Sequence, residues 1–229
     1  MAETTGIFSK PLATGHSWQT VFAAFVIACV AGTLWEEVLY LVQHHEWVAR
    51  TGTVIGPFSP IYGYGALAFC VFLGWTLKSW TGWQSWVGTY LISCLIGGTM
   101  EFMMSLIAEV VFHEVIWDYH DRFLNICGRT TEPFMLGWGL AGLLLIKVVY
   151  PLIIKLTSVI PYAIGEPIFI LLLVFMVVDL FLTYGALGRQ AMRAAGNADT
   201  TNFLWQFFDK YYPDEWLIKR FPAITVNGG

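Results

Sequence analysis

Residues 97–129 read GGTMEFMMSLIAEVVFHEVIWDYHDRFLNICGR, an apolar helix followed directly by a compact polar loop. In the helix, polar side chains recur at steps of four, at Glu101, Ser105, Glu109 and His113. Because an α-helix rises about 1.5 Å per residue and turns about every 3.6 residues, these side chains form one seam roughly 18 Å long. An ionisable group inside a bilayer costs a few kcal/mol or more unless it faces a partner or water. The seam therefore predicts a functional site in a membrane-spanning helix.

The composition of the whole chain indicates a membrane protein. Hydrophobic residues make up 57% of it, charged residues only 12%, and the mean hydropathy is +0.63, whereas soluble domains have about a quarter charged residues. The windows long enough to cross a hydrocarbon core about 30 Å thick are 18–42, 61–77, 84–112, 134–154 and 164–187. The sequence therefore predicts an all-α membrane protein in which residues 1–188 form one polytopic domain, a bundle of five transmembrane helices.

The remaining residues, 189–229, differ in composition from the bundle. Residues 189–201 are polar and small, which is typical of a linker, and the next segment, FLWQFFDKYYPDEWLIKRF, mixes aromatic and charged side chains. Such a mixture suits the headgroup layer of a membrane. We expect an interfacial amphipathic helix interrupted at Pro213, and the alternative is an ordered tail docked on the bundle.

With five spans, one side of the membrane, called side B, receives the loops after the first and third helices and the tail. Five acids in the spans lie toward side B, and they are Glu36, Glu37, Glu101, Glu109 and Asp179. Two motif-rich loops lie there too, GPFSPIYGYGA (56–66) and WDYHDRFLNICGR (117–129). The second and fourth helices begin on this side, and helix N-termini attract anions. With Arg129 at the rim and acids below, we expect a pocket for a zwitterion, a lipid headgroup, or an anion moved with protons or cations.

Some candidate residues stand out, each beside a structural alternative. Glu101 is the deepest acid and the strongest candidate for carrying a proton, in a relay with Glu109 and His113. The structural alternative is that seam residues join helices through hydrogen bonds worth about 0.6 kcal/mol each. For Arg129 the structural alternative is that it pairs with an acid and fixes the loop. For the loop acid Asp118 the alternative is that it is an ordinary solvated side chain.

Metal, cofactor and nucleic-acid chemistry find little support in the sequence. Glu109, His113 and Glu36 are the best set of metal ligands, but no HExxH motif or second close His pair accompanies them. The four cysteines form no close pair, so neither a disulfide framework nor a zinc site is expected. We predict no metal, no cofactor and no nucleic-acid partner.

The combination of motifs resembles a known bacterial membrane family, the CmpB-like proteins of ABC-transporter type IV. The family pattern is a Glu late in the first helix, a GPxxPIYGxGA loop, E-x7-E in the third helix, and then WDY, N, GR and WG. In this chain these elements are, in the same order, Glu36; Gly56–Ala66, which includes Tyr62; Glu101 and Glu109; Trp117–Tyr119, which includes Asp118; Asn125; Gly128–Arg129; and Trp138–Gly139. The resemblance covers about the first two-thirds of the chain. It implies that Glu36 faces inward and adds Tyr62, Asp118, Tyr119 and Asn125 to the candidate site. The chain departs from the family at residues 51–55, where an NRGF-like run is usual, and at residues 123–125, where Pro-Phe-Asn is usual.

Two functions from different classes follow. The first is a transporter or permease subunit whose pocket is lined by Glu36, Glu101 and Glu109, with a separate ATPase subunit as partner, since the chain has no GxxxxGK[ST] motif. The second is a membrane-embedded enzyme acting on a lipid or lipid-linked headgroup, with Glu101 or Glu109 as general base and Arg129 holding the anion. The expected location is the bacterial cytoplasmic membrane, and a small excess of Arg and Lys on side B favours a cytoplasmic C-terminus.

Overall fold

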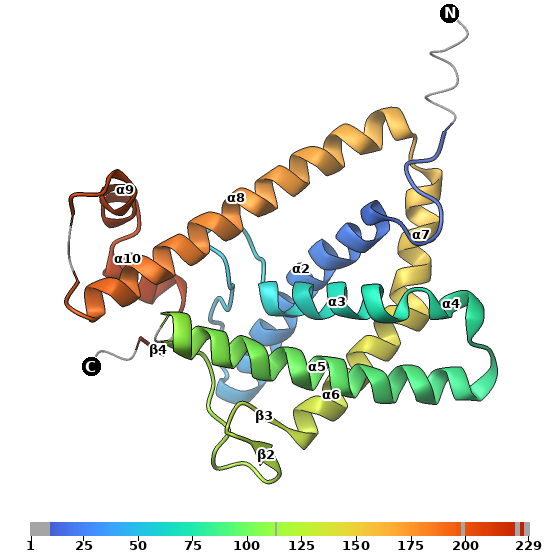
Figure 1. The fold of residues 1–229 in the computed structure, drawn as a ribbon, viewed down its shortest axis with the longest axis horizontal. Helices are drawn as coiled ribbons and strands as arrows, with labels where there is room; N and C mark the ends of the chain where they lie inside the picture. The colour runs from blue at the N-terminus through green and yellow to red at the C-terminus, as the bar shows by residue number, and fades with distance from the viewer. Residues whose placement is uncertain (1–9, 113, 198–199, 223–224, 227–229) are drawn as a thin grey trace, which may run out of the picture.

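The protein is a mainly helical chain in which most of the long helices are apolar (Figure 1). The structure is a computed structural model, and it describes residues 10–112, 114–197, 200–222 and 225–226. Within that part of the chain, four helical segments are long and apolar enough to cross a membrane: α2 (Trp18–His44), α5 (Gly82–Phe112), the run Glu132–Val159, and α8 (Tyr162–Ala194). Each of them contains one of the predicted windows. An integral membrane protein is therefore what the helices and their composition indicate.

The second predicted window, 61–77, has a different structure from the other four. It contains α3 (Pro60–Leu73), then Gly74 and Trp75, and then the short α4 (Thr76–Ser79). With 14 residues, α3 is about 21 Å long, which is less than the core of a bilayer. The count of five long spanning helices therefore rests on taking α3 and α4 together.

The segment Glu132–Val159, which contains the fourth predicted window, is one helical run with a widened turn. It consists of α6 (Glu132–Leu144), the π-helical turn η1 (Leu145–Val149) and α7 (Tyr150–Val159). Pro151 follows η1 and has no N–H to donate to the preceding turn, so the helix accommodates it by widening. In η1, Lys147 Nζ donates to Ser85 Oγ of α5 at 2.5 Å.

Glycines let the central helices approach closely. Helices α5 and α6 share the most extensive helix–helix interface. In it, a Cβ atom on Gly97 would overlap the Trp138 side chain, and a Cβ atom on Gly139 would overlap Cys94. Between α2 and α3, Gly32 faces Tyr62 in the same way. This small-residue packing is the usual way in which membrane helices associate.

We expect Gly97→Ala to lower the melting temperature of the purified protein, because the new methyl group collides with Trp138. Overpacking of this kind costs about 1–3 kcal/mol of stability. Gly137→Ala in α6 is the matched control, since a Cβ atom there meets nothing within 4 Å and alanine favours helix. Equal melting temperatures for the two variants would contradict the packing described.

The C-terminal part of the chain folds back onto α8. Helix α8 continues to Ala194, past the predicted span end at Leu187, so the expected linker begins inside a helix. Helices α9 (Phe203–Tyr211) and α10 (Asp214–Arg220) follow, and Tyr212 and Pro213 separate them. We call residues 200–222 the C-terminal tail.

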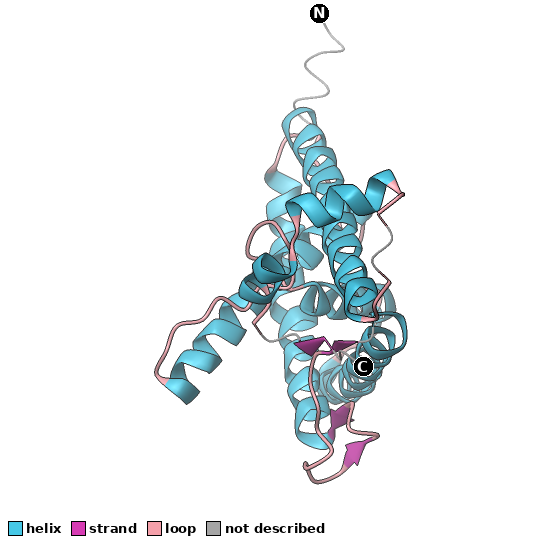
Figure 2. Ribbon diagram, turned by 90° about the vertical axis from the view of Figure 1, so that its left-hand side faces the viewer, coloured by secondary structure: helices cyan, strands magenta, loops and turns pink. Residues whose placement is uncertain are grey.

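Short strands complete the fold, and Figure 2 shows them in magenta. Strand β1 (Glu114–Val115), directly after α5, pairs antiparallel with β4 (Thr225–Val226) near the C-terminus. Strands β2 (Asn125–Ile126) and β3 (Thr130–Thr131) form a hairpin between α5 and α6. Strand β4 thus lies beside the end of α5.

Charge pairs attach the C-terminal tail to α8. Arg189 is 1% exposed and donates to both carboxylate oxygens of Asp209, at 2.8 and 2.7 Å. Arg193 pairs with Asp209 and with Asp214. The hydrogen bonds from Arg189, helped by Arg193, hold the pKa of Asp209 below its usual range.

This lowered pKa predicts how pH affects the attachment of the tail. A carboxylate with a lowered pKa in the folded state stabilises that state above the ordinary value, 3.8 for Asp209, and the stabilisation is lost as the pH falls through the folded-state pKa. Asp209→Asn should therefore melt at a lower temperature than the unmodified protein at pH 7, and the difference should shrink below the ordinary pKa. A difference independent of pH would contradict the ion pairs.

Candidate functional site

Glu36 lies near the C-terminal end of α2 and joins three segments of the chain. Tyr62 in the first turn of α3 donates from its hydroxyl group to Glu36 Oε1 at 2.7 Å. Arg50, from the loop after α2, donates from Nε to Glu36 Oε2 at 3.2 Å. The side chains of Glu36 and Arg50 are 33% and 24% exposed, respectively. The carboxylate and the guanidinium group are thus both accessible and paired.

Glu101 is buried where α5, the hairpin and α6 meet. Its exposure is only 5%. Thr130 donates from its hydroxyl group to Oε2 at 2.6 Å, and Tyr119 donates to Oε1 at 3.3 Å. Burial, and then the Glu101 carboxylate, raise the pKa of the Tyr119 hydroxyl group above its usual value. Glu101 therefore acts as a satisfied acceptor that holds the hairpin to α5.

Arg129 fastens the hairpin to the next part of the polar seam. Its guanidinium group donates to Ser105 Oγ at 3.2 Å and forms an ion pair of 2.5 Å with Glu109. Its backbone oxygen accepts a bond of 2.8 Å from Trp117 Nε1. Arg129 thus pairs with an acid and fixes the loop, which is the structural role expected as its alternative.

The remaining candidates in the loop shape the hairpin itself. Asp118 Oδ1 accepts from the backbone N–H of His120 at 2.9 Å, a bond that lowers the pKa of Asp118. Asn125 Nδ2 donates to backbone oxygens of residues 120 and 122, and Asn125 Oδ1 accepts from Gly128 N–H. Gly128 has φ +68°, a conformation that glycine adopts readily. The relay partner His113 lies outside the described residues.

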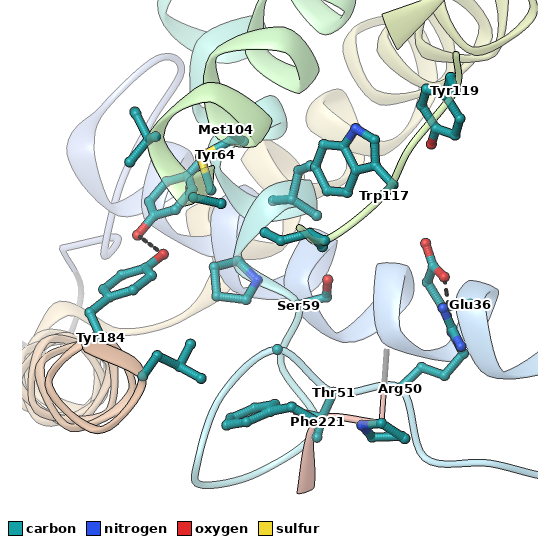
Figure 3. Close-up of a pocket in the computed structure, with 18 residues that line it drawn as sticks. Glu36, Arg50, Thr51, Ser59, Tyr64, Met104, Trp117, Tyr119, Tyr184 and Phe221 are labelled. Carbon is teal, nitrogen blue, oxygen red and sulfur yellow. Dashed lines mark hydrogen bonds and ion pairs between the residues drawn. The ribbon is translucent and has the colours of Figure 1, made fainter. Parts of the chain in front are cut away.

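A cavity of about 510 Å³ lies beside Glu36, enclosed by the helices and by the loop after α2 (Figure 3). This volume falls within the range of about 300–1,000 Å³ that is typical of small-molecule sites. Its described lining comprises Glu36, Arg50, Thr51, Gly52, Ser59, Pro60, Ile61, Tyr64, Met104, Ile107, Ala108, Ile116, Trp117, Tyr119, Tyr184, Leu187, Phe221 and Pro222. The site is therefore built from several distant segments of the chain.

The cavity has polar groups at two ends and apolar walls between them. One end holds the Glu36–Arg50 pair, with Tyr119 nearby. At the other end the hydroxyl groups of Tyr64 and Tyr184 lie 3.1 Å apart. Such a shape suits an amphipathic ligand better than a fully polar one.

This lining differs from the pocket predicted from the sequence. Among the described candidates, Glu36 and Tyr119 line the cavity, whereas the others stand outside its lining: Tyr62, Glu101, Glu109, Asp118, Asn125 and Arg129. The reason is that Glu101 and Glu109 are turned toward hairpin donors. At the N-terminus of α3, Ser59 and Pro60 do line the cavity.

The loop after α2 enters the bundle and contacts the middle of α8. The backbone N–H of Val54 donates to Thr183 Oγ1 at 3.0 Å, and that of Ile55 donates to Asp179 Oδ1 at 2.9 Å. Asp179 is fully buried, and its Oδ2 has no hydrogen-bond partner within the described part of the chain. Non-helical backbone at membrane depth needs such internal partners. Irregular backbone beside a cavity is also how many transporters build a binding site.

Several lining residues were not predicted from the sequence. Arg50 could have been noticed as a basic residue close to the acids at the end of α2, and Tyr64 belongs to the GPFSPIYGYGA motif. Tyr184 and Phe221 have no local signal, because only the fold brings them to the cavity. In the described residues, no group of three or more His, Cys, Asp or Glu side chains could hold a metal ion.

Comparison with known proteins identifies the family of this chain. The model of one family, described as "Putative ABC-transporter type IV", matches residues 23–184. No curated protein matches the chain, and no solved structure does. The match covers most of α2, all of α3, α5, the hairpin, α6 and α7, and most of α8, and it includes Glu36, Tyr62, Glu101 and Arg129. The chain therefore belongs to the Putative ABC-transporter type IV family.

Proposed function

We propose that this protein is the permease subunit of a membrane transporter and that its cavity binds a zwitterionic amphiphile. The observation that carries the proposal is the Glu36–Arg50 pair at one end of a cavity with apolar walls. A ligand with adjacent positive and negative groups can replace the internal pair, its cation facing Glu36 and its anion facing Arg50. Its alkyl part then packs against side chains such as Met104 and Ile107.

The proposal includes the position of the chain in the cell and its partner. We place it in the bacterial cytoplasmic membrane, with α3 and α4 together as a fifth span and the tail at the cytoplasmic surface. A separate ATPase subunit supplies the energy, as the family description implies, because the chain itself has no GxxxxGK[ST] motif. Residues 1–188 then serve as the membrane domain and residues 189–229 as its surface segment.

The enzyme alternative receives less support from the geometry. A general base must reach the proton that it abstracts. Both oxygens of Glu101 already accept hydrogen bonds, and Glu109 is paired with Arg129. Neither carboxylate lines the cavity, so we favour binding and transport over catalysis.

Competition binding tests the proposal. The purified protein in lipid nanodiscs is titrated with radiolabelled octylphosphocholine below its micelle-forming concentration. We expect saturable binding, with octyl phosphate and octyltrimethylammonium competing about tenfold more weakly, because each matches only one member of the Glu36–Arg50 pair. Absence of saturable binding, or equal competition by the singly charged compounds, would contradict the proposal.

A further inference from the structure

We propose that the C-terminal tail is a wall of this cavity and sets the length of the apolar chain that the ligand carries. This inference rests on the proposed function, since it concerns the same cavity. The residues of the tail that line the cavity are Phe221 and Pro222. Both lie beyond residue 184, where the family match ends. The tail therefore adds to the cavity a wall that the matched region lacks.

The tail can act as a wall because an apolar cluster fixes its position. Phe208, Leu217 and Phe221 are almost fully buried, at 0%, 1% and 3% exposure. They pack with Ala186 and Leu187 of α8 and with Val54 of the loop after α2. Together with the ion pairs of Arg189 and Arg193, this cluster makes the tail an ordered part of the fold rather than a loose extension.

Arg220 ties the tail to the loop that forms another side of the cavity. Its Nε donates to the backbone oxygen of Thr53 at 2.9 Å, and its Nη2 donates to that of Gly56 at 2.7 Å. Asp179 and Thr183 of α8 accept from the intervening backbone N–H groups of the same loop. The loop is thus held by both α8 and α10, and Arg220 is a positioning residue for the cavity.

The tail shares the lining of the cavity with α5. After Pro222 the chain pairs β4 with β1, which directly follows α5. Met104, Ile107 and Ala108 of α5 line the cavity together with Phe221. Strand β4, which follows the tail, thus lies beside the end of α5, and the lining residues of the tail limit the space for an alkyl chain.

Chain-length selectivity tests this inference. Nanodisc-embedded protein is titrated with hexyl-, octyl-, decyl- and dodecylphosphocholine, each below its micelle-forming concentration. Phe221→Ala should raise the affinity for decyl- relative to octylphosphocholine by about fifteenfold, because each of the two additional buried methylenes contributes a factor of about four. Phe221→Leu should shift the chain-length preference in the same direction by a smaller amount. It serves as the test variant if Phe221→Ala does not fold. Ala108→Leu, which narrows the cavity from α5, should favour shorter chains.

Arg220→Met has a different expected effect from the substitutions of Phe221. Without its guanidinium group the loop loses two backbone partners, so the affinity for all chain lengths should fall by about tenfold. Lys219→Met is the matched control, since Lys219 is the exposed neighbour in α10, and it should bind as the unmodified protein does.

The outcomes separate this inference from the proposed function. If the unmodified protein binds octylphosphocholine and all folded Phe221 variants keep its chain-length preference, the tail is not the wall and the proposed function stands. If the unmodified protein binds none of the four compounds, the proposed function itself fails. If Arg220→Met and Lys219→Met lower the affinity for the alkylphosphocholines equally, Arg220 does not have the positioning role.

Discussion

Glu36→Gln is expected to lower the affinity for octylphosphocholine by about tenfold to a hundredfold, because a loss of this size corresponds to the free energy that one hydrogen bond to a charged group contributes. The substitution removes the charge that faces both Arg50 and the cation of the ligand, and it keeps the shape of the side chain. Tyr62 can still donate to the amide oxygen, so the contact between α2 and α3 is retained. Radioligand binding in nanodiscs measures the effect, and the melting temperature shows that the fold is intact.

Two further variants make this result specific. Glu46→Gln removes an exposed acid just after α2, and we expect it to leave the affinity unchanged. Arg50→Met should weaken octylphosphocholine and octyl phosphate, but it should affect octyltrimethylammonium much less, since Arg50 is assigned to the anion. If Glu36→Gln and Glu46→Gln bind equally well, Glu36 does not belong to the binding site.

Glu101→Leu is expected to give the largest loss of stability among the candidate site variants. It removes the acceptor for Thr130 and Tyr119, and each buried donor left without a partner costs about 1–3 kcal/mol. The segment of residues 117–131, which contains the hairpin, should then exchange its amide hydrogens faster, while α8 stays protected from exchange. Hydrogen–deuterium exchange with mass spectrometry, together with thermal melting, measures both effects.

The triple variant Glu101→Leu, Tyr119→Phe, Thr130→Val is the control for this second prediction. Removing the donors together with the acceptor leaves fewer unsatisfied groups, so we expect part of the lost stability to return. Glu101→Gln should lie between the unmodified protein and Glu101→Leu. A Glu101→Leu variant that is as stable as the unmodified protein, with unchanged exchange in the hairpin, would show that Glu101 does not hold the hairpin.

Local sequence patterns were sufficient to predict most of the long helices. The windows 18–42, 84–112, 134–154 and 164–187 each lie within a helical segment of the structure, because hydropathy and length are properties of the segment itself. The window 61–77 was less well described. Hydropathy does not register the interruption at Gly74 and Trp75, where α3 ends.

The polar residues show where such patterns stop being informative. The seam of α5 was visible in the sequence, but whether Glu101 and Glu109 face a cavity or a hairpin depends on the hairpin's own fold. The sequence could not indicate the partner of Asp179, because that partner is a backbone group, the N–H of Ile55. Arg220 likewise binds backbone oxygens that lie far from it along the chain. Partners of this kind leave no mark in side-chain spacing.

The central claim, that a zwitterionic amphiphile occupies this cavity, is tested most directly by mapping where such a ligand attaches. An alkylphosphocholine with a diazirine in its chain is photo-crosslinked to the protein in nanodiscs, and the labelled peptides are identified by mass spectrometry. We predict labelling at residues 104–108 of α5 and at Phe221 and Pro222, suppressed by excess octylphosphocholine. Labelling confined to exposed apolar residues of α8, such as Leu171 and Val174, and insensitive to that competitor, would contradict the account.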